Sequence, residues 1–391
     1  MEYKLEDIFD LQMGKTPSRS NPEYWNSNDH KWISIGDLSR CGKYIEDTKE
    51  YLSDKAVEES GISIIPAGTV VMSFKLSIGK TAIIPEPMYS NEAIMSFRDK
   101  HVIDILPDYT YYMLSSRDWD TGTNKAVMGK TLNKATLSKI KVKVHGIAEQ
   151  KEIVRVLDKL NAVIEARQME IQKLEDLIKA RFVEMFGDPV SNPKGWPMPI
   201  IEDVVSPEKN ALKAGPFGSS LKKEYYVQSG YKIYGQEQVI SGDPNYGDYY
   251  INEEKYKQLE NCAVQAGDVL ISLVGTYGKL LVMPESFEPG IINPRLMKIT
   301  FDRNKVNPYY FQYYFQSDSL KKSLADNTHG GTMDILNLGI VRKLKIPLPP
   351  IELQNEFVAL VNQVDKSKAA IQKSLEEAQL LFDSLMQQYF G

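Results

Sequence analysis

Two long stretches of the chain carry apolar side chains at alternating spacings of four and three residues. One stretch runs from Ile153 to Met185 and the other from Phe357 to Tyr389. A 3.5-residue period held over this length predicts coiled-coil helices. The apolar positions expected to pack between the helices are Ile153, Leu157, Leu160, Ile164, Ile171, Leu174 and Ile178 in the first and Val361, Val364, Ile371, Leu375, Phe382 and Leu385 in the second.

Proline and glycine mark the limits of these helices. Pro349-Pro350 precedes the second helix, and Gly187-Asp188-Pro189 ends the first. A helix from about Ile147 to Phe186 would be roughly 60 Å long at about 1.5 Å per residue. A small domain cannot cover the row of apolar side chains along such a helix alone, so we expect the two helices to pack against each other. A pseudo-twofold relation would make them antiparallel, with one globular domain at each end.

The chain also repeats itself outside the helices. Residues Ile65–Glu86 align without a gap on Val264–Glu285, with eight of 22 positions identical. The β-branched and apolar positions also match between the copies, which predicts that each copy forms two short strands joined by a glycine turn. Residues Lys139–Gly187 align in the same way on Lys343–Gly391, with 11 of 49 identical. The sequence therefore predicts a duplicated protein.

These patterns predict an α+β protein. Two similar mixed α/β domains would be separated by two long antiparallel coiled-coil helices in an internal pseudo-twofold repeat. We expect the first domain over 1–145, the central long helix over 146–187, the second domain over 188–346 and the C-terminal long helix over 347–391. The segment DPVSNPKGWPMP, with four prolines, would form the hinge into the second half.

Composition narrows the class of protein. The 391 residues are 42% hydrophobic and 25% charged, and no apolar run approaches the roughly 18 residues of a membrane span. The acidic N-terminus does not resemble a signal peptide. Cys41 and Cys262 are the only cysteines, so a disulfide framework is not expected. We expect a cytoplasmic protein with no membrane partner.

The net charge of −5 hides an uneven distribution. Residues 122–148 hold six lysines and no acid, and residues 209–223 hold four lysines and no acid. Such basic islands could bind phosphates, or they could be ordinary solvated loops.

Gly-Lys-Thr occurs three times, beginning at Gly14, Gly79 and Gly129. A phosphate-binding loop needs a glycine five residues earlier, where this chain has Phe9, Phe74 and Asn124. The repeat of the Gly79 copy carries Leu280 in place of threonine. These are not nucleotide sites.

Other catalytic patterns are weak. Asn307–Tyr310 reads NPYY, which is similar to the (D/N)PP(Y/F) loop of adenine methyltransferases but lacks its second proline. The matching LPDY at Leu106–Tyr109 favours a shared helix start. The four histidines have no metal-ligand spacing and no GxSxG is present. We predict no catalytic residue and no metal site.

The chain resembles the specificity subunits of type I restriction-modification enzymes along nearly its whole length. GKTPSR (Gly14–Arg19) and KWISIGDLS (Lys31–Ser39) resemble the family's N-terminal pattern. AGTVVMSFKLSIGK and AGDVLISLVGTYGK resemble its GDxLxS…GxxGK element, and AGPFGSSLKKEYY resembles a common opening of a recognition domain. IPLPPIELQNEF resembles PPLxEQxxI at the start of the conserved helix. In the first copy His145 and Gly146 replace the prolines, but Gln150 and Gln354 stand in matching places.

The resemblance implies a non-catalytic DNA-specificity subunit. Each recognition domain would read one half of a bipartite target in double-stranded DNA. The paired helices would set the spacer and dock two methyltransferase subunits, and restriction subunits could join them. The resemblance places S-adenosylmethionine, ATP and Mg²⁺ in those partner subunits and no cofactor in this chain.

Candidate DNA-binding residues lie in glycine-punctuated stretches of both halves. They are Lys15, Arg19, Lys75, Lys80 and Lys130 in the first half, and Lys213, Lys222, Lys223, Gln236, Gln238, Lys279, Asn293 and Arg295 in the second. Lysines would contact phosphates, whereas arginine, asparagine and glutamine can read base edges. For Lys80 and Lys279 a structural turn is an equally good interpretation.

Two alternatives stay open. A coiled-coil scaffold would bind no DNA even when partnered. A free-standing methyltransferase would bind the methyl donor as an isolated chain.

Overall fold

The computed structural model describes residues 1–391 except 26, 76, 118, 120–131, 274–278 and 327–336. The chain forms two compact units. Unit 1 contains Met1–Met169 and Gln372–Gly391, and unit 2 contains Glu170–Ile371. Both long helices, α6 (Ile147–Phe186) and α12 (Ile351–Phe390), therefore contribute to both units.

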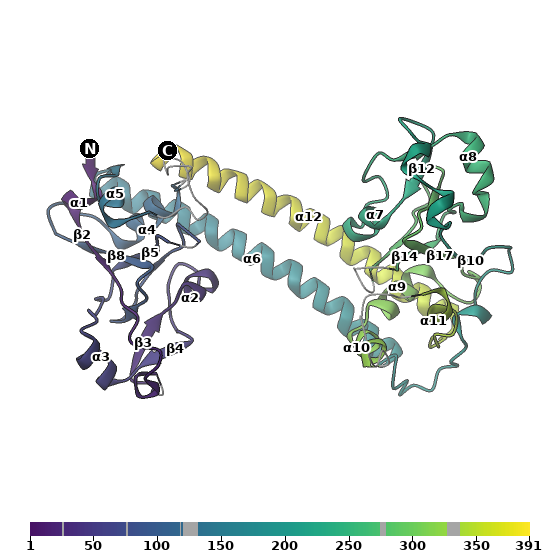
Figure 1. The fold of residues 1–391 in the computed structure, drawn as a ribbon, viewed down its shortest axis with the longest axis horizontal. Helices are drawn as coiled ribbons and strands as arrows, with labels where there is room; N and C mark the ends of the chain where they lie inside the picture. The colour runs from purple at the N-terminus through teal and green to yellow at the C-terminus, as the bar shows by residue number, and fades with distance from the viewer. Residues whose placement is uncertain (26, 76, 118, 120–131, 274–278, 327–336) are drawn as a thin grey trace. The chain divides into compact units, whose positions relative to one another are not determined.

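Unit 1 surrounds a four-stranded antiparallel sheet in the order β2-β8-β5-β6 (Figure 1). A three-stranded sheet, β4-β3-β7, lies beside it, and β3 and β7 pair in parallel. The strands are β1 (Glu2–Lys4), β2 (Phe9–Met13), β3 (His30–Ile33), β4 (Glu50–Leu52), β5 (Val70–Ser73), β6 (Thr81–Ile83), β7 (Tyr89–Ser90), β8 (Ile94–Asp99) and β9 (Lys141–Lys143). The helices are α1 (Leu5–Ile8), η1 (Pro22–Tyr24), α2 (Ile35–Arg40), α3 (Asp54–Ser60), α4 (Pro107–Ser115) and α5 (Lys134–Ser138).

Unit 2 repeats this plan. Its antiparallel sheet has the order β10-β17-β14-β15, and a second sheet, β11-β13-β12-β16, contains the parallel pair β12–β16. The strands are β10 (Leu212–Ala214), β11 (Tyr226–Val227), β12 (Tyr231–Tyr234), β13 (Tyr250–Ile251), β14 (Val269–Ser272), β15 (Leu280–Val282), β16 (Gly290–Ile292) and β17 (Leu296–Ile299). The helices are η2 (Ile201–Asp203), η3 (Gly218–Ser220), η4 (Lys223–Tyr225), α7 (Gln236–Ser241), α8 (Glu253–Gln258), η5 (Glu260–Cys262), α9 (Pro308–Gln316), α10 (Asp318–Asp326) and α11 (Leu338–Arg342).

One inner strand of each four-stranded sheet, β5 in unit 1 and β14 in unit 2, is buried on both faces. In β5, Val70 and Met72 enter one apolar cluster and Val71 enters another. In β14, Val269 and Leu270 divide between two clusters in the same way. Successive side chains of a strand point to opposite faces, so this burial explains the near-continuous apolar run in each copy. The predicted strand–turn–strand repeat is confirmed by the antiparallel pairs β5–β6 and β14–β15.

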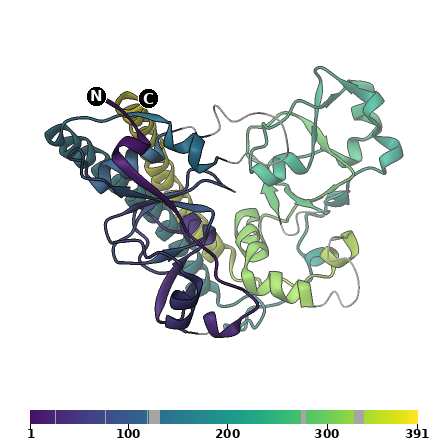
Figure 2. The ribbon, with the colours of Figure 1, turned by 60° about the vertical axis from the view of Figure 1, so that its left-hand side comes forward.

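Within each unit, the segments of α6 and α12 run antiparallel, as the sequence predicts (Figures 1 and 2). In unit 1, Ile153 and Leu157 near the start of α6 share a core with Met386 near the end of α12. In unit 2, the ring of Phe186 at the end of α6 lies 5.5 Å from that of Phe357 near the start of α12. Each unit is thus completed by the C-terminal part of the long helix that begins in the other unit.

The NPYY motif is a helix start. Pro308 is the first residue of α9, and the Asn307 side chain accepts a hydrogen bond from the Tyr309 amide at 3.0 Å. Pro107 opens α4 in the same position of unit 1. Proline suits the first turn because its missing N–H would have no partner there. Within the described ranges, no helix is both long and apolar enough to cross a membrane.

Candidate nucleic-acid interface

The Gly-Lys-Thr sequence at Gly79 forms the turn between β5 and β6. The Ser73 hydroxyl accepts from the Lys80 amide at 3.0 Å and donates to the Ser77 carbonyl at 2.6 Å. Gly79 has φ of 90°, and a Cβ there would lie 2.7 Å from the Trp119 ring. Only glycine fits this turn, so the motif has a structural reason. The turn leaves the Lys80 side chain exposed.

In unit 2 three of the candidate residues meet at one place. Gln236, the first residue of α7, donates from Nε2 to the Ser272 hydroxyl at 2.8 Å. Arg295 donates from Nη1 to Gln236 Oε1 at 3.3 Å. The Asn293 side chain accepts from the Arg295 backbone amide at 2.9 Å. We call Gln236, Asn293 and Arg295 the polar cluster. Arginine and glutamine in fixed positions can present paired donors and acceptors to base edges.

Gln238, another candidate base reader, lies inside unit 2 and not on its surface. Gln238 is 1% exposed, and both ends of its amide are bonded inside unit 2. Oε1 accepts from the Gly235 amide at 2.7 Å, and Nε2 donates to the Tyr246 carbonyl. Such a side chain holds α7 to the loop before β13, and its burial keeps the amide away from a base edge.

In unit 1 the arginine of the GKTPSR stretch, Arg19, interacts with other residues of the protein. Arg19 pairs with Glu50, with Nη2 3.1 Å from Oε2, and its guanidinium lies 3.7 Å from the centre of the Trp25 ring. Half of its side chain remains exposed. The Lys15 ammonium donates to the Ser60 carbonyl. Lys75 is half-buried, 5.5 Å from the Phe74 ring.

The remaining lysines of unit 2 lie on its surface. Lys222, Lys223 and Lys279 are exposed, Lys213 is half-buried, and Lys222 lies 3.7 Å from Glu224. Lys130 falls outside the described residues.

The sequence analysis does not predict a group of polar contacts, which we call the polar junction, between the first domain and α6. Lys43 Nζ lies 2.6 Å from carboxylate oxygens of both Asp108 and Asp158. Tyr44 and Tyr112 donate to these carboxylates at 2.7 and 2.6 Å. Burial and the hydrogen bond to Asp108 raise the pKa of Tyr44 to about 12. The partners are 64 and 115 residues apart in the chain, beyond the reach of any local pattern.

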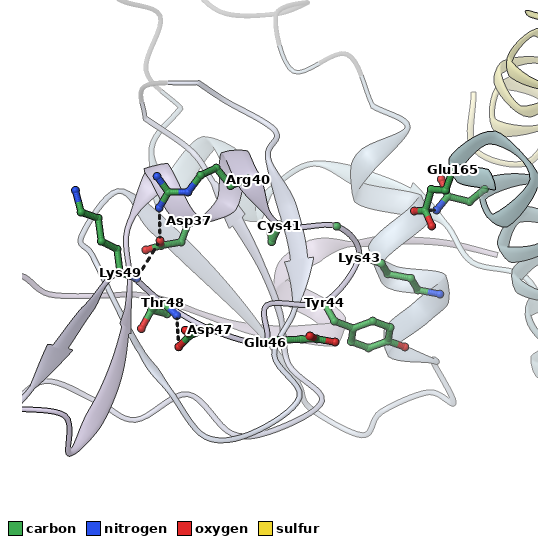
Figure 3. A pocket seen from close by; sticks show the side chains of 12 residues that line it. Asp37, Arg40, Cys41, Lys43, Tyr44, Glu46, Asp47, Thr48, Lys49 and Glu165 are labelled. Carbon is green, nitrogen blue, oxygen red and sulfur yellow. Dashed lines mark hydrogen bonds and ion pairs between the residues drawn. The ribbon is translucent and has the colours of Figure 1, made fainter. Parts of the chain in front are cut away.

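A polar cavity of about 670 Å³ opens beside this junction (Figure 3). Arg40, Lys43 and Lys49 line it together with Cys41 and with Glu165 of α6. Burial raises the pKa of the Cys41 thiol, which makes it a poor nucleophile. The described residues contain no group of histidine, cysteine and carboxylate side chains that could hold a metal ion.

The residues expected between the helices lie on their less exposed faces. Ile153, Leu157, Ile164, Ile178, Val361 and Val364 are buried, and Leu160, Ile171, Leu174, Ile371, Leu375, Phe382 and Leu385 are partly buried. Lys368 stands in this stripe and forms an ion pair with Glu175 at 2.9 Å in unit 2.

Comparison with known proteins defines the class. Residues 1–176 and 213–380 match the family described as Type I restriction modification DNA specificity domain. The chain belongs to this family, with one copy of the domain in each half.

Individual relatives agree with this assignment. The chain is 22% identical to the type I restriction enzyme MjaIX specificity subunit of Methanocaldococcus jannaschii over 98% of this chain and 90% of the relative. It is 28% identical to the EcoR124I/EcoR124II specificity subunit of Escherichia coli over 46% and 48% of the two chains. The fold also matches a type I S subunit from M. genitalium, with a TM-score of 0.57 and 13% identity over 100% and 96% of the two chains.

Proposed function

We propose that this chain is the DNA-specificity subunit of a type I restriction-modification complex in which each unit reads one half of a bipartite target. The observation that carries the proposal is that both units have the same arrangement of strands in their four-stranded antiparallel sheets. Each half of the chain also matches the DNA specificity family. The chain supplies recognition, whereas the chemistry belongs to partner subunits.

In the second half-site, the polar cluster is the proposed base reader. Its three side chains are held by the bonds described above, and prior fixation lowers the entropy cost of a base contact. Lys213, Lys222, Lys223 and Lys279 would contact phosphates, which fix register and supply salt-dependent affinity.

In the first half-site we propose Lys15, Arg19, Lys75, Lys80 and Lys130 as DNA contacts. Arg19 is the weakest of these, because Glu50 already neutralises its charge. Its stacking on Trp25 supports an additional framework role.

The long helices are the proposed ruler. Each has 40 residues, or roughly 60 Å at about 1.5 Å per residue. A continuous helical pair resists bending, so helix length would set the number of unread base pairs between half-sites. Outward faces of the same helices would dock two methyltransferase subunits.

Partners and cofactors follow from this role. The proposed complex contains double-stranded DNA and two methyltransferase subunits, to which restriction subunits can be added, in the cytoplasm. S-adenosylmethionine, ATP and Mg²⁺ would be bound by these partner subunits, and this chain would hold no cofactor. A scaffold that binds no DNA explains the coiled coil but not the match to a DNA specificity domain in each half.

The test is the genome-wide adenine methylation pattern of the host with and without this gene. We expect deletion to remove one bipartite motif, and complementation to restore it. Complementation with Arg295→Ala should relax or abolish one half of the motif only. An unchanged methylation pattern, together with no duplex binding by the purified complex, would refute the proposal.

A further inference from the structure

Phe217 is the most exposed large hydrophobic side chain in the described part of the protein, at 88%. It lies between β10 and η3, in the AGPFGSS stretch, and belongs to no apolar cluster of the described residues. A phenylalanine left in water gains nothing for folding. Its position therefore indicates a role outside the folded core.

The backbone that carries Phe217 is anchored on both sides. The Gly215 amide donates to the Leu296 carbonyl at 2.9 Å, and a Cβ at Gly215 would lie 1.9 Å from the Asn293 carbonyl oxygen. On the other side, the Ser220 amide donates to the Phe217 carbonyl at 2.8 Å and Leu221 is buried. The loop thus presents the ring from a fixed support, which limits the ordering cost of a contact.

The loop that carries Phe217 packs against the backbone of Asn293, a residue of the polar cluster. Gly215 packs on Asn293, whose side chain accepts from the Arg295 amide. Lys213 precedes the loop, and Lys222 and Lys223 follow it. An isolated apolar ring among basic and amide side chains suits a ligand with anionic edges and apolar faces. Duplex DNA has both, in its phosphates and its base steps.

The duplication provides an internal comparison. In unit 1 the Gly14 amide donates to the Ile94 carbonyl at 3.1 Å, just as Gly215 bonds to Leu296. Two residues further on, unit 1 has Thr16, whose hydroxyl donates to Glu92. The same fold therefore forms without an aromatic ring at this position, so the fold does not require Phe217.

We propose that Phe217 is an apolar wedge that inserts at a base step of the half-site read by unit 2. The inference rests on the proposed function and adds a specificity-determining residue to it. Insertion unstacks the step at an energy that depends on its sequence, so the wedge selects among targets without a hydrogen bond to a base.

The test uses the full-length chain with the host subunits that co-purify with it. Duplexes carry the bipartite motif from the methylation pattern, with 2-aminopurine placed in turn along both half-sites. We expect wild-type protein to raise 2-aminopurine fluorescence at one step of one half-site. Phe217→Ala should abolish that signal and weaken target binding about tenfold, the scale of one lost aromatic–base contact.

Salt dependence and matched variants show whether the loss of affinity in Phe217→Ala comes from the apolar ring or from a phosphate contact. Phe217→Ala should leave the slope of affinity against salt unchanged, whereas Lys223→Ala should reduce it by about one phosphate contact. Phe217→Leu should keep most of the signal, and Thr16→Ala should leave it intact. Wild-type fluorescence with Phe217→Ala, or an equal loss of affinity for unrelated duplexes, would overturn the inference while the proposed function stands. If the wild-type complex binds no duplex, both fail.

Discussion

The side chain of Gln150 fastens the start of α6 to the start of α4. Its Oε1 accepts from the Leu106 amide at 3.0 Å, and its Nε2 donates to the carbonyls of Asp104 and His145, both at 2.9 Å. Gln150 is fully buried. One side chain therefore ties the helix, the approach to α4 and the strand-to-helix connection together.

Gln354 repeats the arrangement in unit 2. It accepts from the Asn307 amide at 2.9 Å and donates to the carbonyls of Lys305 and Pro349 at 2.9 Å each. Each long helix is thus fixed to its own domain by an equivalent glutamine. This accounts for the matching positions of the two glutamines despite low identity elsewhere in the repeat.

We predict that Gln150→Leu and Gln354→Leu each destabilise the protein by about 1–3 kcal/mol, because buried backbone groups lose their partners. Urea unfolding of each variant measures the loss. Gln168→Leu, on an exposed position of α6, is the matched control and should change stability by no more than about 0.5 kcal/mol. Equal stability of Gln150→Leu and Gln168→Leu would contradict this role.

A buried ion pair distinguishes the two sheets. Lys298 Nζ lies 3.1 Å from Asp268 Oδ2, and the side chains are 5% and 0% exposed. In unit 1, Thr69 before β5 stands in the place of Asp268, and Ser96 on β8 stands in the place of Lys298. We predict that Lys298→Met costs about 3–5 kcal/mol, since it leaves Asp268 buried without its counterion.

The repeat supplies the rescue for this variant. The double substitution Asp268→Thr with Lys298→Ser installs the residues that unit 1 has at these positions and removes the unpaired buried carboxylate, so we expect it to be more stable than Lys298→Met alone. Thermal unfolding of the three proteins compares them. A double variant less stable than the single one would show that the two sheets are not interchangeable at this layer.

Aromatic residues at the ends of the long helices complete the two cores. The Phe186 ring lies 4.8 Å from that of Tyr310 in unit 2, and the Phe390 ring lies 5.2 Å from that of Tyr109 in unit 1. Phe186→Ala should cost about 3–5 kcal/mol, and Phe390→Ala less because Phe390 is only partly buried.

Denaturant unfolding tests this order of effects. Leu380→Ala, at a position that is 73% exposed, should have an effect within about 0.5 kcal/mol. If Phe390→Ala is as mild as Leu380→Ala, the end of α12 is not part of the folded core of unit 1.

The junction at Lys43 makes stability depend on pH. Burial acts to raise the pKa of Asp108, but hydrogen bonds from Lys43 and Tyr44 outweigh it and hold that pKa below its ordinary value of 3.8. A carboxylate with a depressed folded-state pKa stabilises the protein fully above its unfolded pKa. The contribution is lost as the pH falls through the folded value.

We therefore expect wild-type protein to be more stable than Lys43→Met at pH 5 to 7, and the difference to shrink below about pH 4. Urea unfolding at several pH values measures both proteins. Lys100→Met, whose lysine bonds only a backbone carbonyl in the described structure, serves as the control. A difference that is constant down to pH 3 would exclude the carboxylate junction as its source.

Local periodicity predicts the fold well and the interface poorly. The heptads and the two-strand repeat can be recognised in the sequence because each pattern involves residues that are close together in the chain. The burial of Gln238 and the ion pair between Arg19 and Glu50, which lie 31 residues apart in the chain, are visible only in the folded structure. Phe217 is not among the predicted DNA-binding residues because an apolar residue is expected inside a protein. Only the fold shows that its side chain lies in solvent.

The length of the helical pair should set the spacing of the DNA target. Removing seven residues from each long helix, 166–172 and 369–375, preserves the heptad phase and shortens each by about 10 Å. At roughly 3.4 Å per base pair, this is up to about three base pairs of spacer. We expect the methylated motif to keep both half-sequences and to lose base pairs from the unread gap.

Two variants make the outcome specific to length. The deletion in α6 alone breaks the pairing of apolar positions along the helices and should destabilise the protein without defining a new motif. A seven-residue insertion at both places should lengthen the gap, because it adds the same rise in the opposite direction. A folded double deletion that directs methylation of the original motif with its original spacer would refute the ruler, and would assign spacing to the recognition domains instead.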